Sequence, residues 1–372
     1  MIFDIVVTRN CNLNCKYCFE KTKVNEDMSV ENIPKLIFFI KKYVNHDYVI
    51  NKEEIIVNFN GGEPLLNFRF IKLFIEKTHT FVKRYSISTN LSFVNKEILN
   101  FLNNYNVTMH VSIDGCKKTN DMNRIDMFGK SYYKTLINNL KLLKTYKNIS
   151  ISLSMVYTPD TVCRLFYNVK YLYKKGFYII NASYASNYVW GANAKRIIEK
   201  QYRKISKLYI HGYQKKKNFY FSIFSDKIRS ILSKASGEIC GAFINEITLL
   251  PNGSFIPCLG FMGNELTENF VCGNWQEETN NNLNRISEFK DRVDKIKNNC
   301  KDCLLTEVCH KSCVLEILRA KNVKESVSAM NCITNQISYF ECERIISKLL
   351  RKNNKRFVSE YKELINKIEV VK

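Results

Sequence analysis

The stretch IFDIVVTRNCNLNCKYCFE, residues 2–20, decides the fold, because an apolar run leads directly into three closely spaced cysteines. Residues 2–7 are rich in β-branched and aromatic side chains, which predicts a buried strand. Cys11, Cys15 and Cys18 follow within eight positions of one another. They therefore lie just past the carboxyl end of a strand, which is where α/β folds gather their chemistry.

The composition is that of a globular protein. The chain has 372 residues, of which 45% are hydrophobic, enough for two domains or for one large domain with an appendage. We find no apolar run of about 18 residues and no signal-peptide pattern, so we expect a soluble, cytoplasmic protein without a membrane partner. Fourteen cysteines in a reducing compartment favour metal binding or redox chemistry over disulfides.

The charge of the chain is strongly positive, at +22 from 57 Lys and Arg against 35 Asp and Glu. Such a charge could attract nucleic acid. The lysines are spread along the whole chain, however, as in NNLKLLKTYKNI at residues 138–149. We expect no nucleic-acid partner, because such binding needs a localised basic face with interleaved aromatic side chains.

The first half of the chain alternates short β-rich runs with longer segments of helical period. The expected strands are 2–7, 54–59, 84–89, 108–113, 149–155 and 177–182. The expected helices are 33–44, 67–82, 95–105, 130–146 and 161–175. Six such units predict an α/β fold, a partial (β/α)6 barrel of the TIM type with parallel strands and crossover helices.

The second half changes in composition. Eight of the fourteen cysteines lie between residues 240 and 332, among Gly, Asn and Pro. ITLLPNGSFIPC, residues 247–258, predicts a hairpin with its turn at Pro251-Asn252-Gly253. The predicted division is a barrel at 1–190, a helical connector at 191–235, a small cysteine-rich domain at 236–342 and an amphipathic C-terminal helix at 343–372.

Three thiolates on a tight loop can ligate three irons of a [4Fe–4S] cluster and leave the fourth iron open. The alternative is a zinc loop, but a structural zinc site needs four ligands. No His and no fourth Cys lies near Cys11, Cys15 and Cys18 in the sequence. The pattern therefore favours an iron–sulfur cluster with one open coordination position.

The Cys-x3-Cys-x2-Cys spacing, with Tyr17 before the last cysteine, resembles the cluster motif of the radical SAM enzymes. The resemblance implies that S-adenosylmethionine binds the open iron and that an electron from the cluster cleaves it to a 5′-deoxyadenosyl radical. That radical abstracts a substrate hydrogen. The cofactors would thus carry the difficult chemistry, while the protein binds and shields them.

Further motifs follow the later strands and resemble the binding motifs that this family has for S-adenosylmethionine. Gly61-Gly62-Glu63-Pro64 matches the GGEP loop that receives the methionine amino group, where glycines allow close backbone approach and Glu63 can accept from the ammonium. A plain turn is the alternative for a lone Gly-Gly pair. The resemblance adds five cofactor-binding candidates in the motifs at and after the ends of the third and fourth strands: Ser88, Asn90, Ser112, Asp114 and Arg124.

Arg124 is expected to pair with the methionine carboxylate, and the alternative is a surface arginine. The chain departs from the family pattern at Cys116, where a Pro is usual, and at Asn120, where a His is usual. These departures concern details of the site around the fourth strand. We name no general base from the sequence.

Seven of the eight cysteines between residues 240 and 332, all but Cys272, form a second set. Their spacing resembles the SPASM extension, which holds two auxiliary [4Fe–4S] clusters. A zinc ribbon is the alternative, but seven cysteines do not fit one tetrahedral site. By the resemblance, the first auxiliary cluster takes Cys240, Cys258 and Cys313, and the second takes Cys300, Cys303, Cys309 and Cys332. The chain thus implies three clusters together with S-adenosylmethionine.

The first auxiliary cluster lacks a fourth cysteine in this assignment. Its remaining iron either stays open for a substrate thiolate or another donor, or is coordinated by a further residue such as Cys272. We expect Cys272 to pack instead as a small hydrophobic residue. Cys116, Cys163 and Cys342 are also interpreted as structural.

The resemblance implies an anaerobic peptide or protein maturase. The substrate would be a ribosomally made peptide, modified by a thioether or carbon–carbon crosslink, and the reductant a flavodoxin or ferredoxin. An anaerobic sulfatase-maturating enzyme, which makes formylglycine, is the alternative. In that family an Asp follows the second cysteine of the extension, whereas Leu259 and Gly260 follow Cys258 here. An iron–sulfur electron-transfer protein is a third possibility, although it has no use for an open iron or a methionine-binding loop.

Overall fold

The computed structural model describes residues 1–20, 24–45, 54–215, 217–234, 242, 245–263, 270–277, 300, 302–309, 313, 315–316 and 329–369, and the backbone alone at 366–369. The contacts divide the chain into two compact units. The first consists of Met1–Ser112, Asn123–Ile151 and Gly241–Asp291, and the second of Ile113–Met122, Ser152–Cys240 and Arg292–Lys372.

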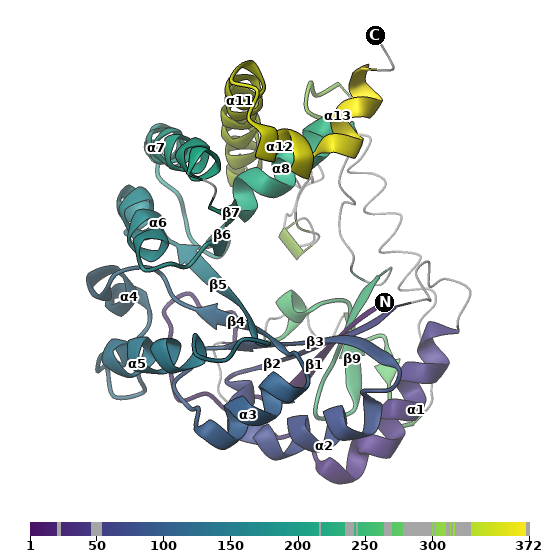
Figure 1. The fold of residues 1–372 in the computed structure, drawn as a ribbon. Helices are drawn as coiled ribbons and strands as arrows, with labels where there is room; N and C mark the ends of the chain where they lie inside the picture. The colour runs from purple at the N-terminus through teal and green to yellow at the C-terminus, as the bar shows by residue number, and fades with distance from the viewer. Residues whose placement is uncertain are drawn as a thin grey trace. The chain divides into compact units, whose positions relative to one another are not determined.

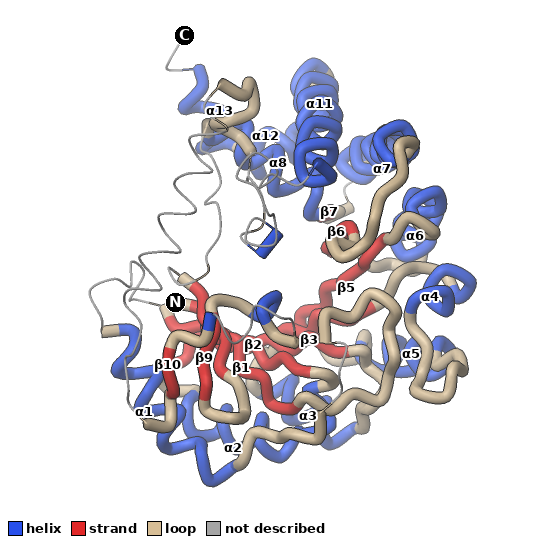
Figure 2. The backbone as a smooth tube through the Cα atoms, turned by 180° about the vertical axis from the view of Figure 1, so that it is seen from behind, coloured by secondary structure: helices blue, strands red, loops and turns tan. Residues whose placement is uncertain are grey.

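The first unit contains a sheet whose central strands are parallel. Its order is β10-β9-β8-β1-β2-β3-β4, and the strands at one edge are visible in Figure 2. The bounds are β1 (Ile2–Thr8), β2 (Ile55–Gly61), β3 (Val82–Thr89), β4 (Thr108–Ser112), β8 (Glu246–Leu249), β9 (Ser254–Ile256) and β10 (Gly273–Asn274).

Helices follow the parallel strands of this unit, as Figure 1 shows. They are α1 (Ile33–Val44), α2 (Phe68–Thr78), α3 (Lys96–Asn104) and α5 (Tyr133–Leu143), with short 3-10 turns η1 (Val30–Asn32), η2 (Pro64–Asn67) and η4 (Leu259–Phe261). Because side chains alternate along a strand, Phe3 and Ile5 of β1 share one face and both are buried. Phe3 packs edge-to-face on Tyr43 of α1, and Phe59 of β2 does the same with Phe74 of α2.

The second unit continues the alternation of strands and helices. β5 (Ser150–Tyr157), β6 (Ile179–Tyr184) and β7 (Tyr220–Phe221) are parallel neighbours. The helices are α4 (Lys117–Asn123), α6 (Leu165–Lys174), α7 (Ala194–Gln214), α8 (Ser222–Ser233), α11 (Ala329–Arg351), α12 (Lys355–Glu360) and α13 (Lys362–Glu369), with the 3-10 turn η3 (Val162–Arg164). α11 contacts both α7 and α8.

The α/β fold class with parallel strand–helix units is confirmed. All six predicted strands form, and each of the five predicted helices forms within its range or with the same bounds. The hairpin at 247–258 also forms, as β8 and β9. The sequence did not predict that β8 would pair in parallel with β1, because the hairpin lies more than two hundred residues further along the chain.

Two elements differ from expectation. α4 was not predicted, because its sequence KKTNDMN has no apolar periodicity. The C-terminal helical region starts earlier than predicted, at Ala329, and is divided into three helices. The first break falls where Asn353 has a φ of +45° and the side chain of Asn354 caps α12.

The domain boundaries drawn from the sequence remain predictions. Among the described residues, no helix is both long enough and apolar enough to cross a membrane.

Phe74→Ala should destabilise the protein by about 3–5 kcal/mol, because it removes a fully buried ring and leaves a cavity against Phe59. The measurement is urea unfolding at equilibrium. Phe38→Ala on α1 is the matched control, since that ring is 53% exposed, and it should change stability by less than about 0.5 kcal/mol. Equal losses in the two variants would show that the β2–α2 contact does not stabilise the fold.

Candidate functional site

The three cysteines after β1 lie on a loop that the backbone of the same unit holds in place. Cys18 N donates to Cys15 O at 3.0 Å, which closes a turn within the motif. Asn14 N donates to Ile125 O at 2.8 Å and Lys16 N to Asn123 O at 2.9 Å, so a second segment fixes the outer side of the loop. The three thiols are partly exposed and form no disulfide.

The GGEP loop after β2 lies directly against the start of the cysteine loop. Gly62 N donates to Thr8 O at 2.9 Å, and Glu63 N donates to Asn10 O at 2.8 Å. A Cβ atom on Gly62 would lie 2.2 Å from Asn10 O, and one on Gly61 would lie 2.1 Å from Thr8 O. Only glycine allows this approach to the cysteine loop, while the approach of the GGEP backbone to a methionine amino group remains a prediction. We call this pair of hydrogen bonds and glycine contacts the loop clasp.

Glu63 is fully buried and its carboxylate has three donors within the protein. They are Leu65 N at 3.1 Å, Thr89 Oγ1 at 2.7 Å and Asn90 N at 2.7 Å. Burial raises the pKa of Glu63 to about 7, and the three hydrogen bonds oppose that shift. The side chain therefore connects the GGEP loop to the end of β3. Acceptance from a methionine ammonium remains a prediction.

Asn90 lies between the end of β3 and the cysteine loop. Its Nδ2 donates to Asn12 Oδ1 at 3.0 Å and lies 4.0 Å from Cys11 Sγ. Its Oδ1 accepts from Ser92 N at 2.8 Å. Ser88, two residues earlier, is exposed. The structure thus brings Asn90 to the cysteines directly and leaves Ser88 accessible at the strand end.

Arg124 is buried with its guanidinium over the ring of Tyr17, at 5.1 Å from the ring centroid. This cation–π contact orients the guanidinium beside the motif. Arg124 is therefore no surface arginine, as the alternative reading supposed. Its pairing with a methionine carboxylate remains a prediction.

Ser112 and Asp114 fall in different compact units. Ser112 ends β4 in the first unit. Asp114, in the second unit, is buried and accepts from Val156 N at 3.1 Å, while Asn120 Oδ1 accepts from Asp114 N at 3.2 Å. Asn120, where the family has a His, thus has a local structural partner.

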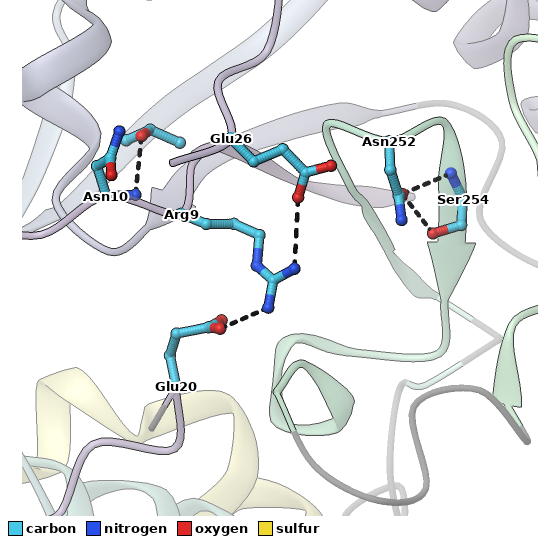
Figure 3. Close-up of polar contacts among 7 residues, drawn as sticks. Arg9, Asn10, Glu20, Glu26, Asn252 and Ser254 are labelled. Atoms are coloured by element: carbon cyan, nitrogen blue, oxygen red, sulfur yellow. Dashed lines mark hydrogen bonds and ion pairs between the residues drawn. The ribbon is translucent and has the colours of Figure 1, made fainter. Parts of the chain in front are cut away.

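An ion-pair network missed by the sequence analysis closes the base of the cysteine loop. Arg9, just before the motif, pairs with Glu20, just after it, at 2.6 Å, and with Glu26 at 3.3 Å. Figure 3 shows the guanidinium between the two carboxylates. Glu20 is buried, so the pair is shielded from solvent. The only available signal was the presence of opposite charges on the two sides of the motif.

The second cysteine set is only partly described. Cys240 lies outside the described residues, Cys258 belongs to the first unit and Cys313 to the second. Within the second unit, the sulfur of Cys332 interacts electrostatically with those of Cys309, Cys300 and Cys303, and burial together with these charges raises its pKa. These four cysteines are the predicted ligands of the second auxiliary cluster, and none of them is in a disulfide.

Cys272 is buried, and its Sγ donates to Phe270 O at 3.1 Å, which is compatible with the packing role expected of it. In the part of the chain that the structure describes, no three His, Cys, Asp or Glu side chains gather around the position of a single metal ion. A [4Fe–4S] cluster differs in this respect, because each thiolate binds a separate iron. The thiol-only donor sets and the turn of the motif fit such clusters.

Gly62→Ala should destabilise the protein by about 1–3 kcal/mol, because the new methyl group forces the GGEP loop away from the cysteine loop. Anaerobic reconstitution followed by iron analysis should show the loss of about four irons from the first site. Gly191→Ala is the control, since no atom lies within 4 Å of its added Cβ. A Gly62→Ala chain with full iron content would contradict the importance of the loop clasp.

Glu63 should make stability depend on pH between about 4.5 and 7. Its pKa is raised from 4.5 to about 7 in the folded state, so in this window the folded chain holds more protons than the unfolded chain, and stability falls as pH rises. The fall should reach about 3 kcal/mol. Unfolding measured without S-adenosylmethionine should show this slope in the wild type and a flatter one in Glu63→Gln. An equal pH dependence of stability in the wild type and in Glu63→Gln would contradict the raised pKa of Glu63.

Comparison with known proteins agrees with this geometry. Residues 5–164 match the Radical SAM superfamily. An uncharacterized protein MJ0907 of Methanocaldococcus jannaschii is 32% identical over 45% of this chain and 56% of its own length. The radical SAM cyclopropyl synthase TigE of Paramaledivibacter caminithermalis is 32% identical over 42% of this chain and 35% of its own length. The chain thus spans about half, or less, of the length of these two relatives.

A longer match is found with the cysteine-type anaerobic sulfatase-maturating enzyme of Clostridium novyi, at 23% identity over 82% of this chain and 85% of the relative. Among solved structures, native anSMEcpe with bound AdoMet and Cp18Cys peptide has a TM-score of 0.77 at 20% identity, over 94% of this chain and 99% of that one. Streptococcus suis SuiB bound to precursor peptide SuiA has a TM-score of 0.63 at 16% identity, over 88% of this chain and 75% of that one.

The cysteine loop, its loop clasp and these matches lead to one conclusion. Residues 5–164 are a radical SAM domain, and the chain shares its fold with the solved structures of anSMEcpe and SuiB.

Proposed function

We propose that this chain is a radical SAM/SPASM enzyme that reductively cleaves S-adenosylmethionine and oxidatively modifies or crosslinks a residue of a ribosomally made peptide. The observation that carries the proposal is the arrangement around the first cysteine motif. Three thiols on one loop are held by the loop clasp and lie beside Asn90 and the Arg124–Tyr17 pair. This arrangement suits a cluster with one open iron and an amino-acid ligand beside it.

Each part of this arrangement has a separate task in the proposal. Cys11, Cys15 and Cys18 hold the first cluster. When bound, the cluster supplies the electron that cleaves S-adenosylmethionine, and the 5′-deoxyadenosyl radical takes a hydrogen atom from the substrate. The GGEP loop and Asn90 position the methionine end of the cofactor. The buried guanidinium of Arg124 supplies a positive charge for a carboxylate, with its orientation fixed by Tyr17.

The second half of the chain is proposed to hold two auxiliary clusters. Cys300, Cys303, Cys309 and Cys332 hold the second one, which is supported by the electrostatic coupling of their sulfurs. Cys240, Cys258 and Cys313 hold the first, as the SPASM resemblance implies. When bound, the auxiliary clusters would supply an acceptor for the second electron of the oxidation, and a flavodoxin or ferredoxin in the cytoplasm would be the reductant.

The peptide substrate is supported by the proteins that share this fold. SuiB was solved with its precursor peptide SuiA, and anSMEcpe with the Cp18Cys peptide. Crosslinking is the form of oxidation proposed here, because the carboxylate expected in a sulfatase-maturating enzyme has no counterpart after Cys258. Leu259 and Gly260 occupy those positions, in η4.

Formylglycine formation is the second candidate, because the Clostridium novyi sulfatase-maturating enzyme matches most of both chains. The two functions differ in their products. A crosslinking maturase removes two hydrogens from a short peptide and leaves a bond that survives proteolysis. A sulfatase-maturating enzyme instead converts one Cys or Ser of a sulfatase peptide to an aldehyde, which hydrazine reagents label.

Cys15→Ala and Cys309→Ala should separate the two cluster regions. After anaerobic reconstitution the wild type should hold about twelve irons and form 5′-deoxyadenosine with dithionite and S-adenosylmethionine. Cys15→Ala should abolish this cleavage, by more than about a thousandfold, because the open-iron site is lost. Cys309→Ala should retain cleavage within about tenfold of the wild type but form no modified peptide.

Cys163→Ala is the control, since this exposed cysteine belongs to neither predicted set. Normal cleavage by Cys15→Ala would contradict the proposed role of the first motif. Loss of cleavage in both cluster variants would contradict the division between the two regions.

A further inference from the structure

A buried lysine lies beside the cysteine-rich segment of the second unit. Lys227, on α8, is only 4% exposed. Its Nζ donates to Val308 O at 2.8 Å and to Asn335 Oδ1 at 2.8 Å. Both acceptors are neutral. A buried ammonium group is costly unless an opposite charge compensates it, so these two hydrogen bonds do not account for its presence.

Burial lowers the pKa of Lys227, and two neighbouring sulfurs oppose that shift. Its electrostatic neighbours are Cys309 and Cys342. Cys342 is fully buried, its Sγ lies 3.6 Å from Phe224 O, and burial raises its pKa well above the usual value, so it stays a neutral thiol. Cys309 is the neighbour that belongs to the predicted ligands of the second auxiliary cluster. It directly follows Val308, whose carbonyl accepts from the lysine.

Cys309 is coupled in turn to the other cysteines of its set, through Cys332. Two nearby carboxylates, Asp226 on the same helix and Glu341 on α11, have other partners. Asp226 accepts from Tyr220 OH at 2.8 Å, and Glu341 lies 3.3 Å from Arg203 and 3.1 Å from Arg344. Lys227 thus has two sulfurs as electrostatic neighbours, those of Cys309 and Cys342, and two neutral oxygen acceptors.

We propose that Lys227 is the counter-charge of the second auxiliary cluster, held by Cys300, Cys303, Cys309 and Cys332, and that it raises the reduction potential of that cluster. This inference rests on the proposed auxiliary cluster. A cluster with four thiolate ligands is anionic and gains one more negative charge on reduction. A fixed ammonium group beside it in a poorly solvated site stabilises the reduced form more than the oxidised form.

The position of Lys227 also connects the cluster region to a cavity. The lysine lines a cavity of about 400 Å³ together with Tyr157, Tyr184, Ser222 and Asn335. Tyr157 and Tyr184 end β5 and β6, the ends at which α/β barrels carry out chemistry. A raised potential would make the second cluster a better acceptor for an electron that leaves a substrate in this cavity.

Lys227→Met tests the inference by removing the charge while keeping most of the side-chain length. In an EPR-monitored redox titration of the reconstituted chain, one cluster should become harder to reduce. At a fixed potential its reduced-to-oxidised ratio should fall about tenfold, which corresponds to ~59 mV for one electron. The other two clusters should be unchanged, and Lys227→Arg should restore most of the shift.

Arg229→Met is the matched control, because Arg229 is exposed on the same helix and its loss changes the net charge equally. Unchanged potentials in a Lys227→Met chain with full iron content would overturn the proposal. If Lys227→Met loses the iron of one cluster, retention by Lys227→Arg supports the role of the charge, and loss in both variants overturns it. A wild-type chain with only about four irons would instead refute the proposed auxiliary clusters.

Discussion

The structure around the first cysteine motif depends on two backbone hydrogen bonds, from Gly62 N to Thr8 O and from Glu63 N to Asn10 O. They hold the end of β2 against the residues that leave β1, and a Cβ atom at position 62 would prevent this approach. A loop of three thiols has little core of its own. Its shape is therefore imposed by the end of β2, through the backbone of Gly61 and Gly62.

Other contacts extend the same constraint outward. Glu63 connects the GGEP loop to β3 through Thr89 and Asn90, and Asn90 reaches back to Asn12 in the cysteine loop. Arg9 and Glu20 close the base of that loop. The motif residues that resemble a binding site for S-adenosylmethionine are thus also the residues that hold one another. This double role explains why the buried carboxylate of Glu63 is tolerated here, since it has three internal hydrogen-bond donors.

Much of this could be predicted from sequence patterns. The β-branched runs and helical periods located six strands and five helices, because those signals are local. The spacing of Cys11, Cys15 and Cys18 pointed to a cluster without any knowledge of the fold. The partners of Glu63, the contact of Arg124 with Tyr17 and the pairing of β8 with β1 were not predictable, because each joins segments far apart in the sequence. Lys227 gave no signal among the many lysines of this chain, and only its burial distinguishes it.

The central claim is that the first motif holds a [4Fe–4S] cluster whose open iron binds S-adenosylmethionine. The most direct measurement is the EPR spectrum of the reduced, reconstituted chain with and without S-adenosylmethionine, recorded on a variant in which Cys300 and Cys258 are both Ala to remove the auxiliary signals. The account predicts a single cluster signal whose g-values shift when S-adenosylmethionine is added. A cluster signal that S-adenosylmethionine leaves unchanged, with no 5′-deoxyadenosine formed, would contradict it.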